Sequence, residues 1–144
     1  MKIMGLTTNQ VTHSLKNDKT FVGCFPSNKI PAVHIFPSSM IVNTDKDEQP
    51  GSHWVAMYLD ENICLYFDSF GLPVLENDIV NFLKPYYQKV IYNSVQLQDM
   101  TSVTCGHFCI NFIHHVNSIK SYASFIQSFS HTNLIENDEK VLNV

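Results

Sequence analysis

The chain has 144 residues, of which 44% are apolar and 15% charged, and its formal net charge is −4. This length fits one domain with a real core, and the composition excludes an intrinsically disordered protein. All nine basic residues are lysines. Because arginine's planar fork is the preferred group for phosphate contacts, its absence and the acidic balance argue against strong nucleic-acid binding.

No stretch of the sequence has the pattern of a membrane helix or a secretion signal. A membrane helix needs roughly 18 to 20 consecutive apolar residues, and the segment 1–6 lacks the apolar core of a signal peptide. We therefore expect a soluble intracellular protein without a membrane partner. Four cysteines are too sparse for the disulfide framework of a small secreted domain, so we expect free thiols at Cys24, Cys64, Cys105 and Cys109.

The first third of the chain predicts a short helix and two strands. The segment 7–15 predicts the helix, with a threonine cap. The apolar runs 21–25 and 39–43 are separated by prolines, which is typical of strands punctuated by turns. The polar run 45–51 is a loop.

The middle third predicts a central hairpin, a helix and another strand. Residues 53–59 and 63–67 are apolar at nearly every position around a polar turn, which indicates two strands covered on both faces. The helix runs from 74 to 83, with Leu75 on its apolar face, until Pro85 ends it. Residues 89–97 are rich in β-branched side chains and predict the next strand.

The last third predicts helices. Phe108, Phe112 and Val116 follow helical spacing, so a helix begins at or just before Cys105, with Thr104 or Ser102 as its cap. A further helix covers 122–129, and the residues from 136 onward form an acidic tail. The whole predicts an α+β fold, with a mixed central β-sheet flanked by helices.

Cys105 is the candidate nucleophile. A cysteine in the first turn of a helix lies where backbone N–H groups and the positive end of the helix dipole converge, and these favour the thiolate. Cys109, one turn further along and embedded among apolar residues, has the profile of a buried structural cysteine.

The central hairpin supplies a candidate base and its orienting acid. If the turn is Asp60–Glu61, opposed residues have numbers that sum to 121, and His53 lies across from Asp68. Opposed side chains have Cβ atoms about 4.5 to 5.5 Å apart, which suits an imidazole held by a carboxylate. A three-residue turn that includes Asn62 would instead place Ser69 opposite His53.

Gln98 is the candidate oxyanion donor. It precedes Cys105 by seven residues, in the loop that leads into the nucleophile helix. With the backbone N–H of Cys105 it can form an oxyanion hole, in which one donor is worth about 3 to 4 kcal/mol.

Three runs and their order resemble the adenovirus protease (adenain) family of cysteine endopeptidases. The order His, acidic residue, Gln, Cys is that family's, and so is the seven-residue step from Gln to Cys, which is usually one residue shorter in the related SUMO and ubiquitin-like proteases. The runs are Gly51-Ser52-His53-Trp54, Asp68-Ser69-Phe70-Gly71 and Cys105-Gly106-His107-Phe108-Cys109.

The resemblance implies one cysteine protease domain over residues 1–144, with the adenain/SUMO-protease-like fold and the nucleophile at a helix N-terminus. It implies catalytic roles for His53, Asp68, Gln98 and Cys105, and an indole of Trp54 that packs on the histidine. The residues implied at the substrate-binding site are Gly51, Ser52, Trp54 and Gly106.

The resemblance also implies a substrate and a location. The expected activity is cleavage after glycine, at Leu-x-Gly-Gly-like sites, in viral or virus-like structural precursors. The expected location is the host nucleus or cytoplasm, or the virion. Adenoviral enzymes bind an activating peptide through a disulfide, but no cysteine lies at that place upstream of Gln98. A disulfide-linked activator is therefore not expected, and an activating peptide as such remains open as a partner.

Other readings of the same residues stay open. One is a protease that processes SUMO or ubiquitin-like proteins, another is an inactive family member acting as a binding module, and a third is an acyltransferase. Cys109, His114 and His115 fit no established four-ligand zinc spacing, so we expect neither a metal nor a cofactor.

Overall fold

A computed structural model describes residues 5–49, 51–118 and 121–142. Its core is a five-stranded sheet with strand order β1-β2-β3-β4-β5. The inner pairs β2–β3 and β3–β4 are antiparallel, and the outer pairs β1–β2 and β4–β5 are parallel. The strands are β1 (Phe21–Pro26), β2 (Ser38–Asn43), β3 (Trp54–Leu59), β4 (Cys64–Phe67) and β5 (Val90–Tyr92).

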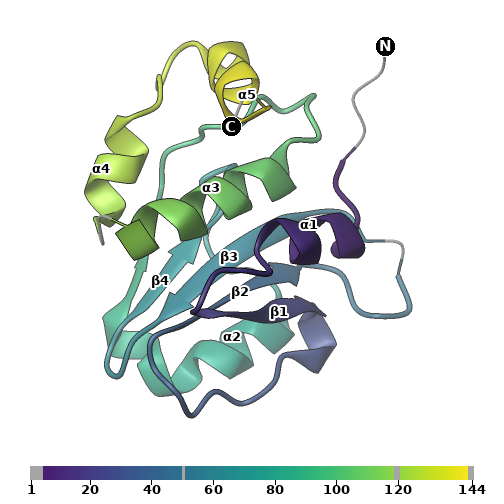
Figure 1. The fold of residues 1–144 in the computed structure, drawn as a ribbon, viewed down its shortest axis with the longest axis vertical. Coiled ribbons are helices and arrows are strands. Elements are labelled where there is room, and N and C mark those ends of the chain that lie inside the picture. Colours follow the sequence, from purple (N-terminus) through teal and green to yellow (C-terminus); the bar gives the residue numbers. More distant parts are fainter. Residues whose placement is uncertain (1–4, 50, 119–120, 143–144) are drawn as a thin grey trace.

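Helices cover both faces of this sheet, as Figure 1 shows. Helix α3 crosses one face, with α1, α4 and α5 around it, and α2 lies on the opposite face. The helices are α1 (Thr8–Ser14), α2 (Asn77–Leu83), α3 (Cys105–Ser118), α4 (Tyr122–Gln127) and α5 (Leu134–Leu142), and 3-10 turns span Ser27–Lys29 and Lys84–Lys89. The predicted α+β fold with a mixed central sheet is confirmed. Within the described ranges, no helix has the length and apolar character needed to cross a bilayer.

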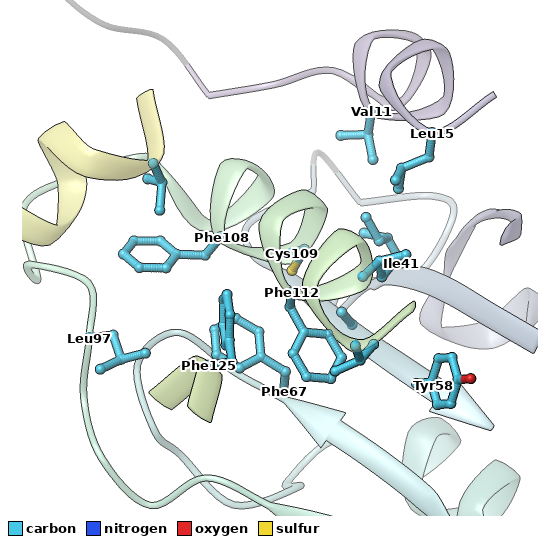
Figure 2. Packing of buried hydrophobic residues seen from close by; sticks show 14 of the residues in the cluster. Val11, Leu15, Ile41, Tyr58, Phe67, Leu97, Phe108, Cys109, Phe112 and Phe125 are labelled. Atoms are coloured by element: carbon cyan, nitrogen blue, oxygen red, sulfur yellow. The ribbon is translucent and has the colours of Figure 1, made fainter. Parts of the chain in front are cut away.

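The strands alternate their side chains between two apolar cores. On the α3 face, Ile41, Ala56 and Phe67 pack with α1, α3 and α4 (Figure 2). The ring of Phe67 stacks on that of Phe112, with centroids 5.0 Å apart and 9° between the planes. On the α2 face the neighbouring residues of the same strands, such as Met57, form the second core. Burial on both faces is why the two hairpin arms are apolar throughout.

The hairpin joining β3 to β4 exists, but its predicted register is wrong. Leu59 pairs with Cys64, so opposed residue numbers sum to 123 rather than 121. The turn is Glu61–Asn62, because Asp60 and Ile63 already exchange backbone hydrogen bonds of 2.8 and 3.4 Å.

A register error of two residues leaves every side chain on its original face, because strand side chains repeat with period two. His53 and Asp68 lie one residue beyond the ends of β3 and β4, and their side chains still meet there. The three-residue turn that was the alternative would have put Asp68 on the opposite face.

Several elements are shorter than predicted, and α4 for example ends at Gln127 rather than at residue 129. Helix α2 begins at Asn77, because the Glu76 carboxylate caps it by accepting from the Ile79 N–H at 3.0 Å, and Leu75 lies outside the helix with 73% of its surface exposed. Strand β5 ends at Tyr92, where Asn93 leaves the sheet to bond the backbone of Asp68.

The expected acidic tail is instead helix α5. Its Val141 joins the α3-face core, and Asn137 and Asp138 are buried. Of the acidic residues that suggested a tail, Glu136 and Glu139 are exposed, whereas Asp138 lies on the inward face of the helix.

Candidate active site

Cys105 is the first residue of α3, and its side chain is 9% exposed. The helix can begin this close to β3 because the next residue is glycine. A Cβ on Gly106 would lie 3.2 Å from Trp54 Cδ1 and 3.3 Å from Leu6. Gly106 is thus buried beneath the indole, where its small size lets the nucleophile approach the base.

His53 lies directly before β3 and is hydrogen-bonded to Asp68, with 2.8 Å between Nε2 and Oδ1. Both side chains are largely buried. The Phe70 backbone N–H also donates to Asp68 Oδ1, at 2.8 Å, which fixes the carboxylate. With Nε2 engaged by Asp68, the other ring nitrogen of His53 is left for a second partner.

The ring stacked on His53 is that of Phe70, with centroids 4.7 Å apart and planes 17° apart. The sequence resemblance had implied Trp54 for this contact, and that is wrong. The Trp54 indole instead packs over Gly106 and donates its Nε1–H to the Leu6 carbonyl at 3.2 Å. Phe70 belongs to the Asp68-Ser69-Phe70-Gly71 run, but nothing in that run distinguished its role.

The surroundings of His53 favour its protonated ring. Burial lowers the pKa of His53, but the hydrogen bonds to Asp68 and Cys105 and the charges of both partners outweigh burial and raise the pKa from 6.5 to about 9. At neutral pH the ring is therefore an imidazolium. A positive charge beside the sulfur and a helix N-terminus behind it are the groups that favour a reactive thiolate.

The other three cysteines differ from Cys105. All four cysteines of the chain lie in the described ranges and all are free, as expected. Burial raises the pKa of Cys24, Cys64 and Cys109, for Cys64 to about 12. Cys109 is fully buried and donates its thiol to the Trp54 carbonyl at 3.4 Å, so it belongs to the core, as predicted.

Gln98 is buried beside Cys105 and its side chain is held at both ends. Ser69 Oγ donates to its Oε1 at 2.6 Å, and its Nε2 donates to the Ser102 carbonyl at 3.0 Å. Because an amide nitrogen carries two hydrogens, and the described residues provide Ser102 as the acceptor for one, the second can serve a group in the cleft. The sequence did not reveal that Ser69 orients this amide.

These groups line one cleft of about 290 Å³. Of the predicted substrate-binding residues, Gly51, Ser52 and Trp54 line it, whereas Gly106 lies beneath it. Gly51 has a φ of +87°, which favours glycine, and the Ser52 N–H donates to Asn43 Oδ1 at 3.3 Å. The lining residues that the sequence did not predict are Gly5, Leu6, Phe70, Ser102 and Val103.

The described residues contain no cluster of three or more His, Cys, Asp or Glu side chains arranged to hold a metal ion. His115 instead bonds Ser124 Oγ at 2.8 Å, and Cys109 faces Trp54.

Known proteins are similar to this chain in part of its sequence and in its fold. No family model matches the sequence. A protein of Acanthamoeba polyphaga mimivirus named "Putative thiol protease" is 40% identical over an alignment of 86 positions, which takes in 51% of this chain and 28% of that protein. The chain thus spans less than a third of the length of that relative.

Two solved structures of the ASFV pS273R protease have a fold similar to that of this chain. The crystal structure of that protease matches 95% of this chain and 66% of its own, with a TM-score of 0.63 and 18% identity. Its selenomethionine form matches 94% and 66%, with the same TM-score and identity. The cysteine-protease fold expected from the sequence is confirmed: this chain folds like the ASFV pS273R protease.

Proposed function

We propose that residues 1–144 act as a cysteine endopeptidase domain. The observation that carries the proposal is the convergence of Cys105, His53 and Gln98 on one cleft, with Asp68 bonded to the far side of the imidazole at 2.8 Å. A nucleophile needs a base within reach and a third group to orient that base, and here each lies on a different element of one rigid sheet–helix unit. The name of the mimivirus relative and the fold of the ASFV protease support the same chemistry.

The proposed mechanism is acyl transfer in two halves. The Cys105 thiolate attacks the scissile carbonyl carbon, and the negative charge that develops on oxygen is stabilised by the Gln98 amide and the Cys105 backbone N–H. His53 donates its proton to the departing amine, which leaves a thioester. Water, activated by the now neutral His53, attacks the thioester carbonyl and gives its proton to the ring, which restores the imidazolium. The C–S bond then breaks, which releases the carboxylic acid product and restores the Cys105 thiolate.

The proposed substrates are protein precursors of a virus or virus-like element, cut after glycine in Leu-x-Gly-Gly-like sequences. The support is the sequence resemblance together with the shape of the site, where Trp54 and Leu6 stand at the cleft beside Cys105. A narrow cleft that excludes a Cβ next to the scissile bond selects glycine there.

The test is covalent labelling followed by intact mass measurement. A peptide vinyl sulfone ending in Leu-x-Gly-Gly is added to the wild type, to Cys105→Ala and to Cys24→Ala, a control at a partly exposed thiol. One adduct on wild type and Cys24→Ala, absent from Cys105→Ala, supports the nucleophile. A matched probe ending in Leu-x-Ala-Ala that labels equally well contradicts the glycine selectivity.

Failure to label has two separable meanings. If candidate virion peptides restore labelling, the enzyme needs an activating partner. If neither peptides nor a ubiquitin-like precursor gives an adduct or a cleaved product, the chain is a binding module and the endopeptidase proposal is wrong. Cleavage of a ubiquitin-like precursor, with short peptides inert, identifies the tag-processing alternative.

A further inference from the structure

Helix α5 presents two neighbouring polar residues to the interior of the protein. Asn137 is 1% exposed and Asp138 is 8% exposed, whereas the flanking Glu136 and Glu139 face solvent. Burying a carboxylate and an amide is unfavourable unless both are hydrogen-bonded, so their partners indicate what the helix holds in place.

Asp138 holds the two hydroxyl groups that immediately precede the nucleophile helix. Its Oδ1 accepts from Thr104 Oγ1 at 2.7 Å and from Ser102 Oγ at 3.1 Å, and those two hydroxyls lie 3.0 Å from each other. The sequence had suggested Ser102 or Thr104 as caps of α3. Their hydroxyl groups instead bind a carboxylate from a helix more than 30 residues further along the chain.

Asn137 holds the other end of the same segment. Its Nδ2 donates to the Leu97 carbonyl at 3.0 Å and to the Ser130 carbonyl at 2.6 Å, and its Oδ1 accepts from the Ser130 N–H at 2.8 Å. Both amide hydrogens and the carbonyl oxygen are therefore used. Leu97 is the residue before Gln98, so this contact fixes the entry to the oxyanion segment, which we define as residues 97–104.

The oxyanion segment has few regular backbone contacts of its own. Leu97 and Gln98 donate backbone N–H groups to the Ser69 carbonyl at 2.8 and 3.0 Å, and the Gln98 amide donates to the Ser102 carbonyl. The placement of the Gln98 amide thus depends on where Ser102 lies, and Ser102 is tied to Asp138.

We propose that Asp138 and Asn137 of α5 are positioning residues, which hold the oxyanion segment so that the Gln98 amide faces the Cys105 thiolate. The inference rests on the proposed acyl-transfer function. Asp138 contacts side-chain hydroxyls rather than the helix backbone. Its removal therefore leaves the start of α3 and the His53–Asp68 pair in place while the oxyanion donor drifts.

The test separates acyl transfer from simple attack by sulfur. Hydrolysis of a Leu-x-Gly-Gly fluorogenic peptide needs the oxyanion donor, whereas alkylation of Cys105 by iodoacetamide passes through no oxyanion. We expect Asp138→Ala to lower kcat about ten- to a hundredfold. KM and the iodoacetamide rate should stay within about twofold. Asp138→Asn, which keeps one acceptor oxygen at the same place, should recover most of the loss, and Glu139→Ala, on the exposed face of the helix, should match the wild type.

A second variant pair tests the route of the effect. The double variant Thr104→Ala/Asp138→Ala should lower kcat no more than Asp138→Ala alone, because both substitutions remove the same hydrogen bond between Thr104 and Asp138. The proposal is overturned if Asp138→Ala and Asp138→Asn both keep the wild-type kcat, or if kcat and the alkylation rate fall by the same factor. If Asp138→Ala does not fold, kcat and the iodoacetamide rate of Asp138→Asn and Thr104→Ala test the proposal in its place. A wild type that alkylates selectively at Cys105 but hydrolyses no peptide, with or without candidate virion peptides, contradicts the proposed function rather than the positioning role.

Discussion

The two halves of the candidate site are held in place by different kinds of structure. Cys105 and His53 lie at the ends of regular elements, the start of α3 and the start of β3, which pack directly on each other. Gln98 lies on an irregular segment fixed by side-chain hydrogen bonds from Ser69, Asn137 and Asp138. Cys105 and His53, the proposed nucleophile and base, are thus held by regular elements, while Gln98, the proposed oxyanion donor, depends on a few polar contacts.

This difference implies different tolerances to substitution. Backbone ladders and helix packing survive the loss of one side chain, so the thiol–imidazole pair should keep its geometry in most variants. A segment held by single hydrogen bonds moves when one of them is lost, and a displacement of about 1 Å at a reacting centre can cost about a hundredfold in rate.

The largest expected effect is the loss of the nucleophile. Cys105→Ala should abolish peptide turnover, because no other group in the cleft can form the thioester, while the melting temperature stays close to that of the wild type. Turnover and thermal unfolding of the same preparation check this. Cys24→Ala is the control. Residual turnover in Cys105→Ala that exceeds the buffer background would contradict the assignment.

The next effect falls on the irregular half alone. Gln98→Ala should lower kcat about a hundred- to a thousandfold, the cost of one oxyanion donor. The rate of Cys105 alkylation should change little, because the thiol–imidazole pair does not rest on Gln98. Gln127→Ala, at an exposed glutamine at the end of α4 that does not line the cleft, is the matched control. Equal losses in the two variants would contradict the role of Gln98.

The pH profile tests the regular half. The folded-state pKa of His53, about 9, lies above its ordinary value of 6.5. The protonated ring therefore stabilises the fold fully below pH 6.5, and this contribution is lost as the pH rises through about 9. Activity should fall over the same interval, because the neutral ring cannot protonate the leaving amine.

Asp68→Asn sharpens that measurement. Without the carboxylate the imidazolium loses its main partner, so the alkaline limb of kcat should move to lower pH. Glu61→Gln, which removes an exposed carboxylate in the turn between β3 and β4, should leave the limb in place. An alkaline limb that is the same in wild type and Asp68→Asn would mean that another group controls it.

The smallest expected effect concerns the ring stacked on the base. Phe70→Leu removes an aromatic contact with His53 but retains apolar cover, so we expect a loss of about 0.5 to 1.5 kcal/mol in the free energy of unfolding. The fall in kcat should be correspondingly modest. Chemical denaturation and steady-state kinetics measure the two quantities. A loss of activity as large as that of Gln98→Ala would contradict the minor role assigned to the Phe70 ring.

The residues held by regular elements could be predicted from the sequence better than the contacts that hold the irregular segment. His53 and Asp68 could be paired from hairpin geometry, even with a register wrong by two, because they flank β3 and β4 at the same end of the hairpin. The position of Cys105 at the start of a helix could be predicted because the helical spacing of apolar residues begins there. These inferences rely on local periodicity, which one sequence displays.

Contacts between distant segments left no comparable pattern. An acidic stretch at 136–140 looks the same whether it is a solvated tail or a helix with Asp138 turned inward. Likewise Phe70, rather than Trp54, stacks on His53 because the chain leaves the sheet after Phe67, and no residue spacing encodes that departure. The start of α2 was misplaced because Glu76, an uncommon N-cap, supplies the capping oxygen.

The segment before α1 lies at the catalytic cleft. Gly5 and Leu6 line the cleft, and the Leu6 carbonyl is bound by the Trp54 indole. A peptide fused at the N-terminus would therefore be tethered within a few residues of the cleft lining, at an effective concentration in roughly the millimolar range. A fused tag ending in glycines would act as a tethered competitor, so kinetic constants measured with such a fusion describe an enzyme that already faces its own substrate.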